Sequence, residues 1–148
     1  MKNKNIFIII LAAFFLFLPF NLQQKNIINR ASAAESKDKI IVYYFHTNYR
    51  CASCVKIEQY SSEAVRSGFP KELKSGKIVW KVVDVDEAQS KHFVKDYQLY
   101  TKSLVIVKMK NGKQIEWKNL NKVWELLYNK NKFIVYVQDE VKKYLKGN

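Results

Sequence analysis

The residues best suited to chemistry in this chain are Cys51 and Cys54, its only two cysteines. They stand directly after a strand-like run at 39–45. If a helix begins at Cys51, its unpaired backbone N–H groups and the positive end of its dipole favour the thiolate, which is the reacting form of cysteine. Cys54 then lies about one turn further along nearly the same helix face, where it can attack a mixed disulfide formed at Cys51. This spacing indicates thiol–disulfide exchange.

The elements that must position these cysteines can be predicted from hydrophobic periodicity. A continuous apolar run predicts a buried strand at 40–45, and apolar residues at helical spacing predict a helix at 51–67. Asn111-Gly112 is typical of a hairpin turn, because both positions tolerate positive φ. The other expected elements are a turn at 71–76, strands at 77–85, 104–109 and 114–117, and helices at 86–98, 120–128 and 133–145.

This order of elements predicts an α/β fold with a four-stranded mixed sheet and helices on both of its faces. Strands that are separated by helices are expected to pair in parallel through right-handed crossovers, and the Asn-Gly hairpin adds an antiparallel edge. The length of 148 residues suits one domain with accessory segments.

Basic residues dominate the charge of the chain, whose formal net charge is +13. The functions to consider are therefore binding to nucleic acid, binding to an anionic membrane surface, or a solubilising coat of lysines. The lysines are scattered along the sequence, with no arginine-rich stripe and no nucleic-acid motif. We interpret them as a solubilising coat and expect no nucleic-acid partner.

The N-terminal residues 1–33 have the pattern of a signal peptide or a signal-anchor. A basic stretch at 1–5 precedes an apolar run at 6–20, and Ala31-Ser32-Ala33 has the small-residue pattern of a cleavage site. The run of 15 apolar residues is shorter than the roughly 20 that span a bilayer, which favours cleavage. The long stretch at 21–30 before the cleavage site leaves an uncleaved anchor open.

The remaining chain divides into a polar linker at 34–38 and a single domain at 39–148. We expect this domain to be exported to a periplasmic or other extracytoplasmic compartment, with an N-terminal membrane anchor as the alternative to full release. On the oxidising side of a membrane, a lone cysteine pair can cycle between redox states or stay oxidised.

The element order, the Cys-x-x-Cys motif after the first strand and the hairpin before the last helices resemble the thioredoxin fold. The resemblance covers about residues 39–128, with an extra C-terminal helix beyond. Within that superfamily, the chain is similar to small exported bacterial thioredoxin-like proteins labelled as the ArsF-type subunit of a nitrophenyl compound nitroreductase. The similar stretches are Phe45-His46-x-x-x-Arg50-Cys51-x-x-Cys54-x-x-x-Glu58, 117–120 and 124–126. This similarity implies a reductive partner system.

Two positions depart from the thioredoxin pattern. Thioredoxins bury a carboxylate six residues before the first cysteine, and this chain has Phe45 there. His46 is then the nearest titratable candidate for proton transfer, and its usual pKa suits general acid–base work. The cis-proline before the third strand of thioredoxins falls at Ser103, where a cis bond would cost about 2.5–4 kcal/mol. We therefore expect a trans loop at Ser103, which leaves the usual substrate-docking edge in doubt.

Arg50 directly precedes Cys51, and its positive charge would lower the pKa of that thiol. Glu58 could balance Arg50 or Lys56 across the helix surface. An ordinary loop role stays open for both His46 and Arg50. The predicted catalytic residues are Cys51, Cys54, His46 and Arg50, with no bound cofactor and no metal ion.

Three functions are compatible with this motif. The leading one is an exported thiol–disulfide oxidoreductase that acts on a disulfide- or dithiol-containing exported protein, with a membrane electron donor as a further candidate partner. The second is a copper-binding module, since two thiolates can hold Cu(I) whereas zinc wants four ligands. The third is a non-catalytic thioredoxin-fold subunit with a structural disulfide, although so short a loop adds little stability. The motif sets neither the direction of electron flow nor the oligomeric state.

Overall fold

The structure is a computed structural model that describes residues 38–146. The predicted signal at 1–33 and the linker up to residue 37 lie outside the described residues, so they stay predictions. Within 38–146, we find no helix whose length and apolar character would let it cross a membrane.

Four strands form one mixed sheet in the order β2-β1-β3-β4, so the predicted sheet is confirmed. The strands are β1 (Lys39–His46), β2 (Ile78–Asp84), β3 (Ser103–Lys110) and β4 (Lys113–Asn119). β1 pairs in parallel with β2 and antiparallel with β3, and β4 pairs antiparallel with β3. The two inner strands, β1 and β3, hold most of the buried positions of the sheet.

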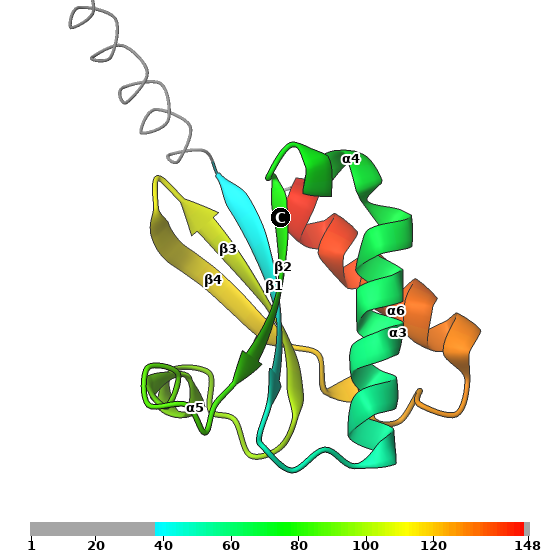
Figure 1. Cartoon of the computed structure of the whole chain (residues 1–148). Coiled ribbons are helices and arrows are strands. Elements are labelled where there is room, and N and C mark those ends of the chain that lie inside the picture. Colours follow the sequence, from blue (N-terminus) through cyan, green and yellow to red (C-terminus); the bar gives the residue numbers. More distant parts are fainter. Residues whose placement is uncertain (1–37, 147–148) are drawn as a thin grey trace, which may run out of the picture. The chain divides into compact units, whose positions relative to one another are not determined.

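The helices are α3 (Ala52–Gly68), α4 (Pro70–Lys74), α5 (His92–Asp96) and α6 (Lys130–Lys146), with a 3₁₀ turn η1 (Asn121–Val123). α3 and α6 lie side by side over one face of the sheet, and α5 lies near one end of the sheet on its other side (Figure 1). The helices predicted at 51–67 and 133–145 are confirmed as α3 and α6.

Three local predictions are wrong. The turn predicted at 71–76 is mostly the short helix α4, which Pro70 begins at a position where its missing N–H is harmless. The helix predicted at 86–98 shrinks to α5, and the helix predicted at 120–128 is η1 followed by turns. In both segments turn hydrogen bonds replace a continuous helix, as from the N–H of Ser90 to the carbonyl of Glu87 and from the N–H of Asn129 to the carbonyl of Leu126.

The parallel pairing predicted for every helix-linked strand is also wrong, because β3 runs antiparallel to β1. A helix rises about 1.5 Å per residue and a strand about 3.3 Å. α3 has 17 residues and can return the chain along the 8 residues of β1. α5 has only 5 residues, so the chain stays at the end of the sheet where β2 finishes, and β3 begins there.

Two hydrophobic clusters form the core, one on each face of the sheet. Alternate residues of β1 point to opposite faces, as strand geometry requires. Ile40, Val42 and Tyr44 join the cluster under α3 and α6, and Tyr43 and Phe45 join the other. Burying each such side chain contributes about 1.5–3 kcal/mol. Both clusters lie within residues 38–146, so the described part of the chain carries its own hydrophobic core.

Candidate functional site

Cys51 is placed by the chain reversal between β1 and α3. β1 ends at His46, and α3 begins at Ala52 with Cys51 in an extended conformation as the N-cap residue. The loop between them is fastened to the neighbouring connection, because the backbone N–H of Asn48 donates a hydrogen bond to Oδ2 of Asp86 at 2.8 Å. The site is therefore held at the end of the central strand.

Cys51 and Cys54 are joined by a disulfide, with their Cα atoms 5.0 Å apart. The backbone N–H of Cys54 donates a hydrogen bond to Sγ of Cys51 at 3.1 Å, so Cys51 caps the helix through its sulfur. The first turn of α3 contains no acidic residue that would offset the positive end of the helix dipole. In the reduced protein, the same N–H and dipole would stabilise a thiolate at Cys51.

The two sulfur-bearing side chains differ in exposure. Cys54 is only 2% exposed, whereas Cys51 is half-buried. A partner molecule can therefore reach Cys51 and not Cys54, which agrees with the predicted order of attack and resolution.

Arg50 lies next to the cysteine pair, as predicted, but its positive charge is paired with the carboxylate of Glu58. Its Nη2 forms a hydrogen-bonded ion pair with Oε2 of Glu58 on the next turns of α3. Both side chains are about one-quarter to one-third exposed, at 32% and 26%. The carboxylate of Glu58 offsets part of the field that Arg50 exerts on Cys51. The balancing role expected for Glu58 is confirmed.

His46 lies at the end of β1, half-buried, and its ring packs near that of Tyr44 with centroids 6.1 Å apart. Its Nδ1 lies 3.0 Å from the carbonyl oxygen of Thr47. When Nδ1 carries the proton and donates this bond, Nε2 is free to accept a proton. Within residues 38–146, the hydrogen bonds of His46 do not include either sulfur.

Sequence reasoning missed Tyr44, the polar side chain that contacts the pair from the sheet. Its hydroxyl is buried and donates a hydrogen bond to the carbonyl oxygen of Cys54 at 2.7 Å. Burial raises the pKa of Tyr44 to about 12, with Arg50 opposing and Glu58 reinforcing the shift. The alternation along β1 was a usable signal, because it puts Tyr44 on the α3 side and Phe45 on the opposite side.

The segment before β3 approaches the motif from another part of the chain. No cis peptide bond occurs in the described residues, so the trans loop expected at Ser103 is confirmed. Ser103 is 3% exposed, and its hydroxyl donates to the carbonyl oxygen of Thr101 at 2.8 Å. Nε1 of Trp124 donates to the carbonyl oxygen of Lys102 at 3.0 Å, and Nζ of Lys102 lies 5.5 Å from the ring centroid of Tyr49.

A cavity of about 290 Å³ lies between the loop that leads into the motif and this segment. His46 and Thr47 line one side of it, and Thr101 and Lys102 line the other. Tyr100, which is 95% exposed, stands at the same cavity. The start of the loop that leads to Cys51 therefore borders a hollow with an exposed aromatic ring.

A metal centre is not evident in the described part of the chain. There, no three His, Cys, Asp or Glu side chains come together in a way that could hold an ion. His92 is exposed and pairs with Asp96 at 3.9 Å on α5.

Comparison with known proteins gives structural likeness alone. No family model matches the chain, and no curated protein matches it in sequence. Similar solved structures include the germline-specific thioredoxin Deadhead of Drosophila melanogaster, at 19% identity and a TM-score of 0.41 over 74% of this chain and 92% of that one. Thioredoxin of Trypanosoma brucei brucei has 19% identity and a TM-score of 0.42, over 78% and 87% of the two chains. A poplar thioredoxin h has 21% identity and a TM-score of 0.39, over 76% and 91%.

The fold assignment rests on the topology described above rather than on these scores. A mixed sheet in the order β2-β1-β3-β4 has α3 and α6 on one face and α5 on the other side, and a cysteine pair begins the helix after the central strand. The chain has a thioredoxin-like fold.

Proposed function

We propose that this protein is an exported thiol–disulfide oxidoreductase in which Cys51 attacks and Cys54 resolves. The observation that carries the proposal is the asymmetry of the pair. Cys51 caps α3 and is reachable, whereas Cys54 is buried one turn inside the helix. Such an arrangement suits a nucleophile activated by backbone N–H groups and a partner sulfur that reacts only within the chain.

The exchange balances in sulfur bonds, protons and electrons. In the reduced protein, the thiolate of Cys51 attacks a partner disulfide, so a mixed disulfide forms and the first partner sulfur leaves and takes a proton. The thiolate of Cys54 then attacks the sulfur of Cys51, which forms the intrachain disulfide and releases the second partner thiol. The partner gains two electrons and two protons, and the reverse sequence oxidises a partner dithiol.

The surroundings of the pair support a protein partner rather than a small molecule. Lys102 lies beside the exposed ring of Tyr49 in the motif loop, and both can contact a polypeptide that approaches Cys51. The N-terminal signal pattern makes an exported protein the expected partner, with a membrane electron donor as a further candidate. The similarity of residues 45–58 to ArsF-type subunits supports a reductase system as the setting.

Trapping tests this proposal. Cys54→Ser removes the resolving sulfur, so mixed disulfides with partners should accumulate and appear as new high-mass species on non-reducing gels. Cys51→Ser is the matched control, because the remaining Cys54 is buried and should trap few partners. If the Cys54→Ser protein yields no more high-mass species than Cys51→Ser, the oxidoreductase proposal is wrong.

A further inference from the structure

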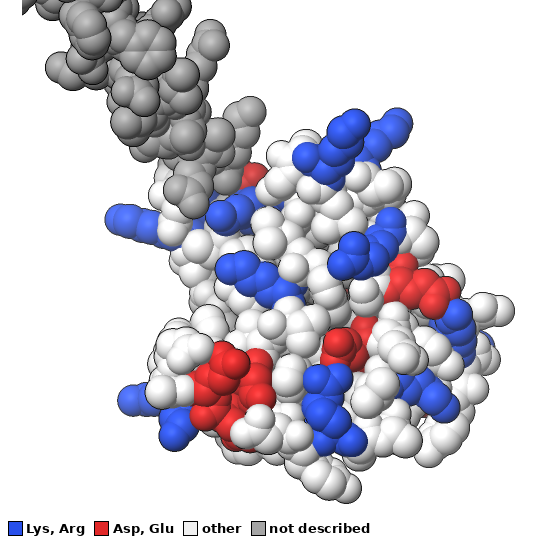
Figure 2. Space-filling view, viewed as in Figure 1, with Lys and Arg blue, Asp and Glu red and all other residues white. Residues whose placement is uncertain are grey.

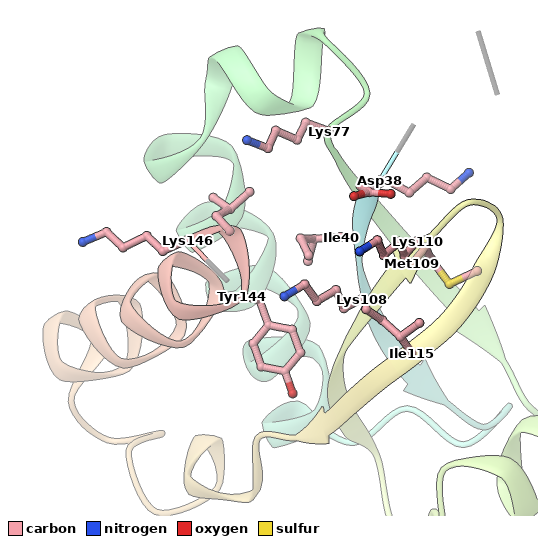
Figure 3. A pocket seen from close by; sticks show the side chains of 11 residues that line it. Asp38, Ile40, Lys77, Lys108, Met109, Lys110, Ile115, Tyr144 and Lys146 are labelled. Atoms are coloured by element: carbon pink, nitrogen blue, oxygen red, sulfur yellow. The ribbon is translucent and has the colours of Figure 1, made fainter. Parts of the chain in front are cut away.

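A second cavity lies at the end of the sheet opposite the disulfide. Its volume is about 390 Å³, and it is formed where β1 begins, β3 ends and the last turn of α6 ends. Figure 3 shows Lys108 and Lys110 on β3 and Lys77 just before β2, and all three line the cavity together with Ile40. The cysteine pair follows the other end of β1, so this cavity is separated from the pair by the length of that strand.

Lysines dominate the lining of this cavity. Five of its residues are lysines and one, Asp38, is acidic. Oδ1 of Asp38 accepts a hydrogen bond from the backbone N–H of Asn111 at 3.3 Å. Within residues 38–146, none of these five lysines forms an ion pair, and the lysines that do form ion pairs lie elsewhere. The five are Lys39, Lys77, Lys108, Lys110 and Lys146.

The visible surface shows the same imbalance. In Figure 2 blue side chains predominate at the end where β1 begins, and the largest red group lies at the opposite end. Lysines that are scattered in the sequence are thus brought together by the fold, because the starts of β1 and β2, the end of β3 and the end of α6 meet at one end of the sheet. A solubilising coat would have no reason to gather around a cavity.

The rest of the lining is aliphatic. Ile40 forms part of the floor and is 4% exposed, while Ile115 on β4 is 54% exposed at the rim. Leu145 completes this apolar part. The site therefore combines ammonium groups with aliphatic side chains, which is the combination that a phospholipid surface favours: phosphates outside and hydrocarbon just beneath.

We propose that this end of the domain is a docking surface for an anionic phospholipid membrane. The lysines bind lipid phosphates, and Ile115 contacts the upper part of the acyl region. Residues 21–37 join the predicted apolar run at 6–20 to this end of the domain, and a chain of that length reaches at most about 60 Å. Docking through this end of the domain would direct Cys51, which follows the other end of β1, away from the membrane and toward partners.

Nucleic acid fits the same cavity less well. Base recognition and stacking use arginine and exposed aromatic rings. The lining has no arginine, and its single aromatic residue, Tyr144, is 6% exposed. Binding to nucleic acid is therefore an outcome that the experiment must exclude.

The experiment uses residues 37–148, which contain the complete core. The protein is sedimented with vesicles of phosphatidylcholine alone and with vesicles of equal parts phosphatidylcholine and phosphatidylglycerol, at low and high salt. We expect binding to the anionic vesicles only, and weaker binding at high salt. Binding to both vesicle types with equal strength would overturn the proposal, as would binding to neither.

Two sets of variants locate the surface. Lys77→Glu, Lys108→Glu and Lys110→Glu combined should weaken binding to anionic vesicles by at least about tenfold. The matched control combines Lys91→Glu, Lys95→Glu and Lys122→Glu, which change the net charge equally at exposed positions outside the cavity. The control should bind nearly as well as the parent. Equal losses in the two triple variants would show a general charge effect and contradict the proposal.

The apolar contact and the alternative partner are tested separately. Ile115→Ser leaves the charge unchanged and should weaken vesicle binding several-fold, and thermal melts of all variants show whether they remain folded. A single-stranded oligonucleotide is added as a second probe. If it binds with the same lysine dependence while the vesicles do not, the membrane proposal is wrong. None of these outcomes depends on the redox activity of Cys51.

Discussion

The buried hydroxyl of Tyr44 donates a hydrogen bond to the carbonyl oxygen of Cys54 at 2.7 Å, which ties the centre of the sheet to the first turn of the helix that carries the disulfide. Because the pKa of Tyr44 is raised to about 12 by burial, the hydroxyl stays protonated and keeps donating throughout the physiological pH range. The bond therefore fixes Cys54 without depending on pH.

Replacing this hydroxyl should destabilise the oxidised protein. Tyr44→Phe should lower the free energy of unfolding in urea by about 0.5–1.5 kcal/mol, the usual contribution of one hydrogen bond. Tyr43→Phe is the matched control, since Tyr43 is also buried and its hydroxyl has no hydrogen-bond partner among the described residues. A similar loss in both variants would mean that the bond to Cys54 contributes nothing specific.

The ion pair between Arg50 and Glu58 predicts opposite shifts in the reactivity of Cys51. Arg50→Ala removes a positive charge next to the sulfur and should raise the midpoint of its pH-dependent alkylation by about half a pH unit. Glu58→Gln frees the field of Arg50 and should lower that midpoint. Arg66→Ala, at the far end of α3, serves as the control and should leave it unchanged. Shifts of the same sign in the first two variants would contradict this account.

His46 should affect the rate of exchange rather than the field at Cys51. His46→Ala is expected to slow the reaction of the reduced protein with a chromogenic disulfide near neutral pH several-fold, because a proton acceptor is lost. The alkylation midpoint of Cys51 should stay where it is. His92→Ala removes an exposed histidine on α5 and should change neither quantity. If the exchange rate of His46→Ala is unchanged, His46 does not take part in proton transfer, and its contact with Thr47 is only structural.

The sequence predicted the sheet and the motif well because those features depend on local patterns. Alternating and continuous apolar runs define β1 and β3, and the cysteine spacing requires only a helix start after β1. The length of α5 and the direction of β3 could not be predicted, because both depend on contacts between distant segments. The bond from Asn48 to Asp86 is such a contact: it joins residues 38 positions apart in the sequence.

The sequence predicted only the part of the candidate site that depends on residues close together along the chain. Cys51, Cys54 and Arg50 are neighbours along the chain, so their proximity follows from sequence alone. Tyr44 reaches Cys54 only because β1 packs under α3, and the lysine cavity forms only because distant chain segments meet at one end of the sheet. Charge counts along the sequence cannot show such a gathering.

The export prediction can be tested without any knowledge of partners. A reporter that is active only after translocation, fused to the C-terminus of the full chain, should be active in cells. Deleting residues 6–20 should abolish that activity, because the apolar run that directs translocation is lost. N-terminal sequencing of the exported material then separates cleavage near Ala33 from a retained anchor. Reporter activity confined to the cytoplasm would contradict export.

Acid stability should depend on Glu140, which links α6 to β4. It is 6% exposed, and its carboxylate lies 2.7 Å from Nζ of both Lys118 and Lys143. Burial alone would raise the pKa of Glu140, but the hydrogen bonds and charges of Lys118 and Lys143 outweigh it and lower the pKa below its ordinary value of 4.5. The folded state therefore binds this proton less tightly than the unfolded state.

The sign of the effect follows from linkage. A group with a lowered pKa in the folded state contributes stability above its unfolded pKa, and this contribution is lost as the pH falls through the folded pKa. Urea unfolding of the parent should show a declining free energy below about pH 4.5, where carboxylates take up protons. Glu140→Gln should be less stable than the parent at neutral pH, and its curve should be flatter in acid, so that the two converge. Glu125→Gln, at an exposed acid without an ion pair among the described residues, should follow the parent curve. A constant difference between the parent and Glu140→Gln at every pH would show that the loss comes from packing and not from the charge of Glu140.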